Sequence, residues 1–321
     1  MGRLPGQPLP GLPAPADDGL REEAWPQDGG GVLPVPSSGR RDLSVTGEAL
    51  DLAILVLASL VPALVYVAWI RRTERYRTEG WGPVLGAFVY GALFATLTAG
   101  FLEAIIVGLG TAVSQSYPAP EFVFLNGNSP LGVFFLVLVV APFVEEALKG
   151  SGVVANRRRL TLLADGPTFG ASVGLGFGFF ETFLYGLGAF VVGGLAAGIV
   201  LILVRSVSSV LLHGSSTGMF GYGYARSRFG VRGPGTGAYY LLAVAMHSAF
   251  NALASLAAIL VLVGVSGVEA NVASYLALVV AIGFAFAAIE HVRAVIQSSE
   301  YPALLKGSGR FAPGRSPPRA R

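Results

Sequence analysis

The sequence predicts an all-α protein, a polytopic membrane helix bundle of about seven transmembrane helices, and three observations support this fold class. Hydrophobic side chains make up 53% of the 321 residues and charged side chains only 13%, whereas about 25% of an ordinary soluble domain is charged. The mean hydropathy is +0.64. Apolar runs of about 20 residues, the length that spans a bilayer as a helix, recur along the chain.

These apolar runs lie between two polar tails. Residues 1–48 are rich in Pro and Gly and have no apolar period, which is typical of a disordered tail. A basic tail, also expected to be disordered, covers 297–321. The transmembrane domain between them, 49–296, contains the expected helices at 50–70, 82–110, 131–154, 168–192, 197–224, 237–264 and 272–290. Within 168–224, either two long helices or three shorter elements fit the pattern.

Basic residues occur in alternate connections. They follow the first, third, fifth and seventh runs, and the other loops contain no Lys or Arg. Because loops rich in Lys and Arg face the cytoplasm, we expect the N-terminus outside and the C-terminus inside, in a multi-pass protein of the cell membrane. The basic segments are RRTERYR at 71–77, the arginines at 157–159, Arg226 with Arg228 and Arg232, and the C-terminal tail.

Composition also excludes some kinds of chemistry. The sequence contains no Cys, which excludes disulfides, thiol nucleophiles and Cys-ligated metals. The net charge of +3 and the pI near 9.3 come from short loops and a tail, so membrane orientation explains them better than nucleic-acid binding. We therefore expect the lipid bilayer, and no nucleic acid, among the partners.

Four ionisable side chains interrupt the apolar runs at one depth. Each lies 12 to 14 residues from a polar edge at Arg157, Pro167, Arg226 or Gly235, which is about 18–21 Å at 1.5 Å per residue. Ionisable groups inside a membrane are costly, and they are retained where they face the protein interior and carry function. We therefore predict that four helices bring together Glu145, Glu181, His213 and His247.

The spacing within these helices fits hydrolytic chemistry. Glu145 and Lys149 are four residues apart and share a helix face, as do His247 and Asn251. A buried carboxylate with a second one beside it, here Glu146, can take a proton from water. Imidazole and amide N–H groups can stabilise the oxyanion that forms on an attacked carbonyl. This combination indicates amide hydrolysis by an activated water.

Four short motifs follow one another in the predicted helices: EExxK at Glu145, FxxxE at Phe177, a helix histidine at His213 and HxxxN at His247. Over roughly residues 135–255 this ordered set resembles the PrsW-type intramembrane proteases, relatives of the CAAX prenyl endopeptidases and of bacteriocin-processing membrane proteases. The resemblance implies an endopeptidase whose substrate is a membrane-anchored protein, such as an anti-sigma factor.

The resemblance also implies roles for individual residues. Glu145 would be the base and Glu146 its partner, while the two histidines and the amide would bind water or the oxyanion. Glu181 departs from the CAAX-type relatives, which have a histidine there, so it would share a proton with Glu145 or help to bind a metal. The implied catalytic set is Glu145, Glu146, Glu181, His213, His247 and Asn251.

A metal requirement stays open at this point. A divalent metal such as zinc uses nitrogen and oxygen ligands, and the four groups at one depth supply them, although the HExxH pattern is absent from the sequence. The candidate ligands are Glu145, Glu181, His213 and His247.

Two alternative functions also stay open. Residues 214–218, GSSTG, fit the GxSxG pattern of serine hydrolases, and Ser216 with His247 as base would indicate a rhomboid-like serine protease. In soluble hydrolases that serine lies on a strained turn between strand and helix, whereas here it lies within an expected helix. Intramembrane Glu and His side chains also serve as proton relays, so a proton-coupled transporter or a non-catalytic membrane scaffold is the second alternative.

Two further expectations concern packing. Gly170, Gly174 and Gly178 recur every fourth residue, so another helix can approach this face closely.

Glu103 and Arg205 each lie 21 residues from a predicted cytoplasmic edge, and we expect both near the outer face. There they would form an ion pair or extend separately to the headgroups.

Overall fold

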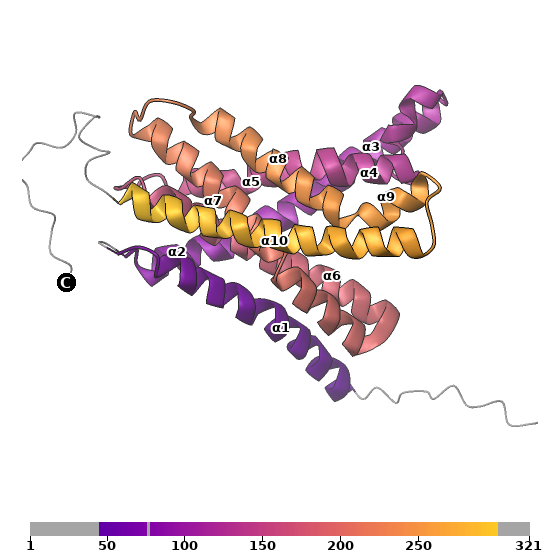
Figure 1. Ribbon diagram of the computed structural model, residues 1–321, viewed down its shortest axis with the longest axis horizontal. Coiled ribbons are helices and arrows are strands. Elements are labelled where there is room, and N and C mark those ends of the chain that lie inside the picture. The colour runs from indigo at the N-terminus through magenta and orange to yellow at the C-terminus, as the bar shows by residue number, and fades with distance from the viewer. Residues whose placement is uncertain (1–44, 76–77, 301–321) are drawn as a thin grey trace, which may run out of the picture. The chain divides into compact units, whose positions relative to one another are not determined.

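The computed structural model of the protein describes residues 45–75 and 78–300, and every regular element in these two segments is helical (Figure 1). The prediction of an all-α polytopic bundle is confirmed. The predicted tails, 1–48 and 297–321, fall largely outside these segments. The elements are α1 (Val45–Arg71), α2 (Trp81–Val89), η1 (Tyr90–Ala95), α3 (Thr96–Ser116), η2 (Pro120–Leu125), α4 (Pro130–Phe135), η3 (Leu136–Val140), α5 (Ala141–Ala155), α6 (Asp165–Ser206), α7 (Ser209–Arg228), α8 (Thr236–Ala254), α9 (Leu256–Leu262) and α10 (Val268–Ser299).

The helices α6 and α7 pack closely along each other because glycines line the face of α6 that meets α7. A Cβ atom added to Gly174 would lie 2.0 Å from the carbonyl oxygen of His213, and one added to Gly170 would lie 2.3 Å from that of Thr217. The predicted close approach at this glycine face is confirmed. It brings His213 on α7 against α6, and α1, α2 and η1 pack on other sides of α6.

The helix α6 reverses direction at Gly194. This residue has φ 79° and ψ −177°, a backbone conformation that glycine adopts readily. The two arms then pack against each other, since Cβ atoms added to Gly186 and Gly198 would meet Ile202 and Phe190 respectively. The reversal agrees with the predicted helices at 168–192 and 197–224, and the return arm is separated from α7 by a short break at Val207 and Ser208.

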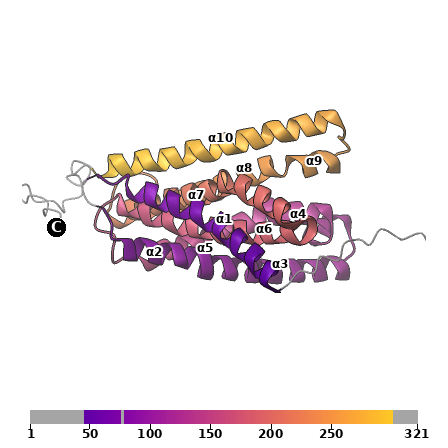
Figure 2. The same ribbon diagram turned by 90° about the horizontal axis from the view of Figure 1, so that it is seen from below.

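Several helices are long and apolar enough to cross a membrane. Five qualify by length and composition among the residues described, or six when the pair α8 and α9, bent by 65°, counts as one span. One of the five is the 64-residue run Asp165–Arg228, which contains the reversal at Gly194. In Figure 2, α10 runs along the edge of the bundle, where it contacts α7, α8 and α9.

One end of the bundle gathers the connections that the sequence marks as basic. Thr168 at the start of α6 donates to Glu74, the backbone N–H of Arg75 donates to Glu300, and Arg293 near the end of α10 donates to Thr73. Leu163 before α6 packs in one apolar cluster with Ala225 of α7. The alternating pattern of basic loops is consistent with this arrangement, and cytoplasmic exposure of this end stays a prediction.

Candidate active site

The helix α5 contributes two acids and a base to a buried polar cluster. Glu145, Glu146 and Lys149 are all buried, and their spacing of three and four residues puts Lys149 beside both acids. Its Nζ lies 2.7 Å from Glu146 Oε1 and 3.5 Å from Glu145 Oε2. It also lies 4.4 Å from the centre of the Phe177 ring. One ammonium group thus serves two carboxylates inside a membrane helix.

Glu146 is held by contacts from three helices. Besides Lys149, its oxygens accept hydrogen bonds from Ser216 Oγ at 3.0 Å and Thr217 Oγ1 at 3.3 Å on α7. His247 Nδ1 on α8 lies 3.1 Å from Glu146 Oε1. A carboxylate only accepts hydrogen bonds, so this contact assigns the proton of a neutral His247 ring to Nδ1. The other nitrogen, Nε2, then carries a free lone pair.

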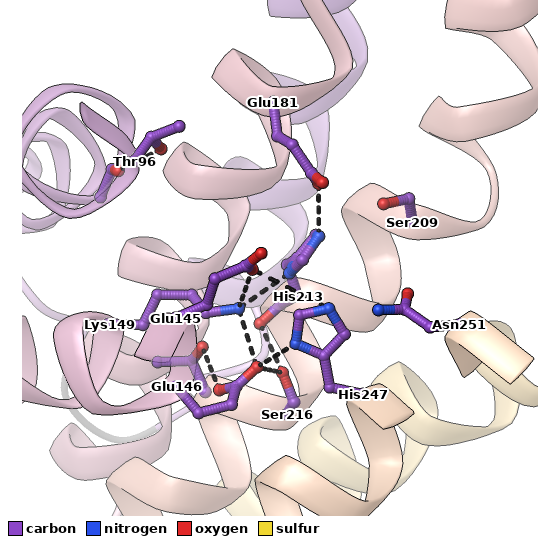
Figure 3. Close-up of polar contacts among 12 residues, drawn as sticks. Thr96, Glu145, Glu146, Lys149, Glu181, Ser209, His213, Ser216, His247 and Asn251 are labelled. Atoms are coloured by element: carbon purple, nitrogen blue, oxygen red, sulfur yellow. Dashed lines mark hydrogen bonds and ion pairs between the residues drawn. The ribbon is translucent and has the colours of Figure 1, made fainter. Parts of the chain in front are cut away.

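His213 has the opposite arrangement. Lys149 Nζ lies 2.9 Å from His213 Nδ1, and an ammonium group only donates, so Nδ1 accepts and a neutral ring carries its proton on Nε2. That atom lies 2.7 Å from Glu181 Oε2 (Figure 3). Gly178 on α6 leaves room for the ring, because an added Cβ would lie 3.3 Å from its Cδ2 atom. The two histidines therefore present different groups to the cluster.

Glu181 is paired with Arg205, which the sequence places near the outer face. Arg205 Nη2 lies 2.7 Å from Glu181 Oε2 and donates to Ser209 Oγ at 3.0 Å. Within the described segments, no ion pair joins Arg205 to Glu103. Of the two arrangements expected for these residues, the outer ion pair is therefore wrong, and Arg205 does not extend to the headgroups either, because it contacts Glu181 and Ser209. The reversal at Gly194 and the break after Ser206 turn Arg205 inward, which a count of residues along straight helices cannot reveal.

Glu145 completes the cluster opposite the histidines. Its Oε2 lies 3.8 Å from His247 Nε2, and the two imidazole rings lie 4.8 Å apart, centre to centre. In Figure 3, the amide nitrogen of Asn251 is turned toward the two histidines. This nitrogen, Nδ2, donates to the carbonyl of Val137 at 2.9 Å. Pro142 has no N–H to donate to the carbonyls one turn earlier, so the amide satisfies one of them and ties α8 to η3.

The donor atoms suit a metal ion. One ligand atom from each of Glu145, His213 and His247 lies within 4.8 Å of the other two, and one carboxylate with two imidazoles is a ligand set that catalytic zinc uses. The contact of His247 Nδ1 with Glu146 also matches the usual support of a metal-binding histidine, whose second nitrogen donates to a carboxylate. The residues therefore fit a divalent metal, provided that Lys149 gives up its contact with His213 Nδ1, the ring nitrogen without a proton.

The arrangement agrees with the comparison to known families. The model of the PrsW family of intramembrane metalloproteases matches residues 79–286, well over half of the chain, and this range contains all six predicted catalytic residues. The chain belongs to the PrsW family of intramembrane metalloproteases. It is therefore a protease, and its apolar helices make it a multi-pass membrane protein. Searches of curated proteins and of solved structures find no match.

Two residues of this site, Arg205 and Lys149, make contacts that the sequence pattern does not predict. Arg205 was assigned to the outer face, although a cation within an apolar run is itself a signal of a buried partner. Lys149 was considered only with the acids of its own helix, whereas it also contacts His213, 64 positions away. Both contacts join separate helices, so helix spacing alone does not predict them.

Proposed function

We propose that this protease is an endopeptidase that hydrolyses a peptide bond of a membrane-associated protein with a water that Glu145 activates. One observation carries the proposal: adjacent acids on one helix have very different surroundings. Glu146 makes four polar contacts of 2.7 to 3.3 Å, whereas the polar contacts of Glu145 measure 3.5 and 3.8 Å. Glu145 thus retains acceptor capacity for a water, as a general base requires.

The neighbours of Glu145 have complementary roles in this proposal. Glu146 orients His247, so that the Nε2 lone pair of the ring faces Glu145. His213 presents an N–H group, held toward Glu181, that can donate to an oxyanion when the substrate carbonyl displaces that contact. Lys149 balances the charge of the two acids, and Asn251 holds α8 against the start of α5.

The metal named by the family fits the same groups. Glu145, His213 and His247 would hold it, with Glu181 beside His213 as a further oxygen donor. His213 would bind through Nδ1 in place of its contact with Lys149, which leaves the Nε2–H group for the oxyanion. A divalent metal such as zinc would polarise the substrate carbonyl and make an attacking water more reactive. The remaining work belongs to the chain itself: Glu145 accepts the proton of the water, and Glu146 and Lys149 fix the two imidazoles.

The position of the site inside membrane helices supports a membrane-anchored substrate in the cell membrane. The family resemblance suggests a regulator such as an anti-sigma factor. The test compares membrane-protein cleavage products from cells that produce the wild type, Glu145→Gln or Glu290→Gln. Glu290 is an exposed acid on α10 paired with Arg293, so its variant is the matched control. We expect at least one protein to remain uncleaved only with Glu145→Gln. Identical products in all three would overturn the proposal.

The metal is tested with the purified enzyme. We expect a chelator to stop cleavage, and we expect metal analysis to find less bound metal in His247→Ala than in wild type. Wild-type enzyme that cleaves at full rate without measurable metal would contradict a metal requirement and leave Glu145 as the only activator of water.

The serine alternative has a direct test. Ser216 Oγ donates to Glu146 and to the carbonyl of His213, and His247 Nδ1 contacts Glu146 and not Ser216. We therefore expect Ser216→Ala to retain cleavage within about tenfold of wild type, since it removes one hydrogen bond to an acid with other partners. Complete loss of cleavage with an unchanged fold would favour the serine mechanism.

A further inference from the structure

A groove lies between the two arms of α6 on the outside of the bundle. It is shallow and widely open, has a volume of about 550 Å³, and is lined by Leu184, Tyr185, Gly188, Ala189, Val192 and Leu201. From Leu184 to Val192 it covers two helical turns, about 12 Å at 1.5 Å per residue. At Gly188 the surface of the groove has no side chain, and an added Cβ would meet no atom within 4 Å. Small residues such as Gly188 and Ala189 let another helix approach closely in a membrane.

The inner end of the groove lies next to the site. The guanidinium of Arg205 lies over the Tyr185 ring, with its Cζ 3.9 Å from the ring centre. The same guanidinium contacts Glu181, which contacts His213. Tyr185 and Arg205 therefore separate the apolar groove from the candidate catalytic groups by a single layer of side chains.

Arg205 also has a spare hydrogen-bond donor at this point. Its Nε atom is buried and has no hydrogen-bond partner within 45–75 and 78–300. An unsatisfied donor is expensive in an apolar environment, and lipid tails offer no acceptor. A protein helix that unwinds near the site frees backbone carbonyl oxygens, and one of these can accept the hydrogen bond from Arg205. A protein segment that enters the site would therefore satisfy this donor.

We propose that this groove, residues 184–201 with Arg205 at its inner end, binds the transmembrane segment of the substrate, and that the N–H at Arg205 Nε donates to a carbonyl oxygen of that segment where the segment bends toward Glu145. The inference rests on the proposed function and adds the route by which the substrate arrives. Leu184, Val192 and Leu201 contact the apolar side chains of the segment, and Gly188 allows its backbone to come close.

The test fills the groove without touching the site. Gly188→Leu adds a side chain where no atom lies within 4 Å, and Gly283→Leu on α10 is the matched control, since it is also an exposed helical glycine with open space around it. Two probes are compared for each enzyme: the membrane protein that stays uncleaved with Glu145→Gln, and a short peptide that covers only its cleavage site.

We expect Gly188→Leu to lower the ratio of cleavage rates, membrane protein over peptide, at least tenfold through a higher KM, and Gly283→Leu to leave this ratio within twofold of wild type. An unchanged ratio in Gly188→Leu would overturn the groove as a docking site. Equal loss of both activities would also overturn it, because damage to the site explains that result. Failure of the wild type on both probes would instead refute the proposed function, and the inference with it.

Cross-linking provides a second measurement that does not depend on rates. A photoreactive amino acid at position 188, in the Glu145→Gln background, should form adducts with the transmembrane segment of that same membrane protein, and one at position 283 should not. Adducts with lipid alone at position 188 would show that the groove holds lipid and would overturn the proposal.

Discussion

Buried carboxylates occur in two regions of this protein, and their partners differ in kind. Where the α5–α6 connection meets α1, Asp165 accepts from the backbone N–H groups of Thr161 and Leu162. Nearby, Glu74 accepts from Thr168 Oγ1 and the N–H of Glu79. In the centre, by contrast, the acids contact an ammonium, a guanidinium and two imidazoles: Lys149, Arg205, His213 and His247.

This difference separates structural acids from functional ones. Uncharged donors from nearby loop and helix ends satisfy Asp165 and Glu74, which fixes the ends of α1 and α6. The central acids draw charged and titratable partners from α5, α6, α7 and α8, and buried groups without partners remain close by, such as Arg205 Nε within the described segments. Charged and titratable side chains that are buried together in this way are typical of catalytic sites.

The largest expected effect is on catalysis at Glu145. Glu145→Gln keeps the volume of the side chain and removes the base, so cleavage should fall by about 10²- to 10⁴-fold. The thermal unfolding temperature should stay close to that of wild type, because Glu145 makes only long polar contacts. The measurement is the initial rate with purified enzyme in bilayer discs, with Glu290→Gln as control. A rate above about one tenth of wild type would contradict a general-base role.

The next largest effect should be on stability at Lys149. Lys149→Met leaves Glu146 without its closest cation, at 2.7 Å in the wild type, and breaking a buried ion pair costs about 3–5 kcal/mol. Adding Glu146→Gln should recover most of this stability but no activity, because the double variant no longer orients His247 with a carboxylate. Chemical unfolding and cleavage rates measure the two effects. If the single variant unfolds like wild type, the central acids are not held by Lys149.

A smaller and purely structural effect is expected at Asp165. Asp165→Ala removes acceptors for two backbone N–H groups and the Thr161 hydroxyl, and unsatisfied buried donors cost about 1–3 kcal/mol. The unfolding free energy should fall by that amount, while the cleavage rate per folded molecule stays within twofold of wild type. A tenfold loss of cleavage rate with unchanged stability would show that Asp165 acts in catalysis, and would contradict the separation of structural from functional acids.

The last effect, confined to a pH range, is expected at Glu74. Burial raises the pKa of Glu74 from its ordinary value of 4.5 to about 7, and the nearby charge of Asp165 adds to this effect. The folded state therefore holds this proton more tightly than the unfolded state. The stability that Glu74 contributes is complete below about pH 4.5 and is lost as the pH rises through about 7.

Glu74→Gln removes this titration while its amide can still accept from the N–H of Glu79 and donate to Thr168. The rise of the pKa from 4.5 to about 7 corresponds to about 3 kcal/mol, most of which is lost between pH 5 and pH 8. The unfolding temperature of wild type relative to Glu74→Gln should therefore fall by about 5–10 °C over this range, since 1 kcal/mol shifts it by about 2–4 °C in a domain of this size. Unfolding temperatures measured across this range for both proteins provide the test. If the difference between the two unfolding temperatures stays constant with pH, or changes in the opposite direction, Glu74 is ionised in the folded protein throughout this pH range.

Several features of the fold and the site follow from the sequence by itself. Apolar runs of bilayer length determine where the helices form, since in lipid each backbone N–H and C=O group needs a partner within the segment. The glycine repeat determines that α7 can lie against α6. The equal depth of Glu145, Glu181, His213 and His247 predicts that they can meet, because helix rise converts residue number directly into height.

Only the tertiary structure decided how these groups divide their contacts. Depth along a helix says nothing of rotation or of a reversal such as the one at Gly194, which brings Arg205 to Glu181 and forms the groove between the arms of α6. The pairing of Glu146 with His247 and of Lys149 with His213 likewise depends on how four helices turn toward one another. Contacts of about 3 Å between side chains on separate helices depend on the packing of the whole bundle. The spacing of residues within one helix does not determine that packing.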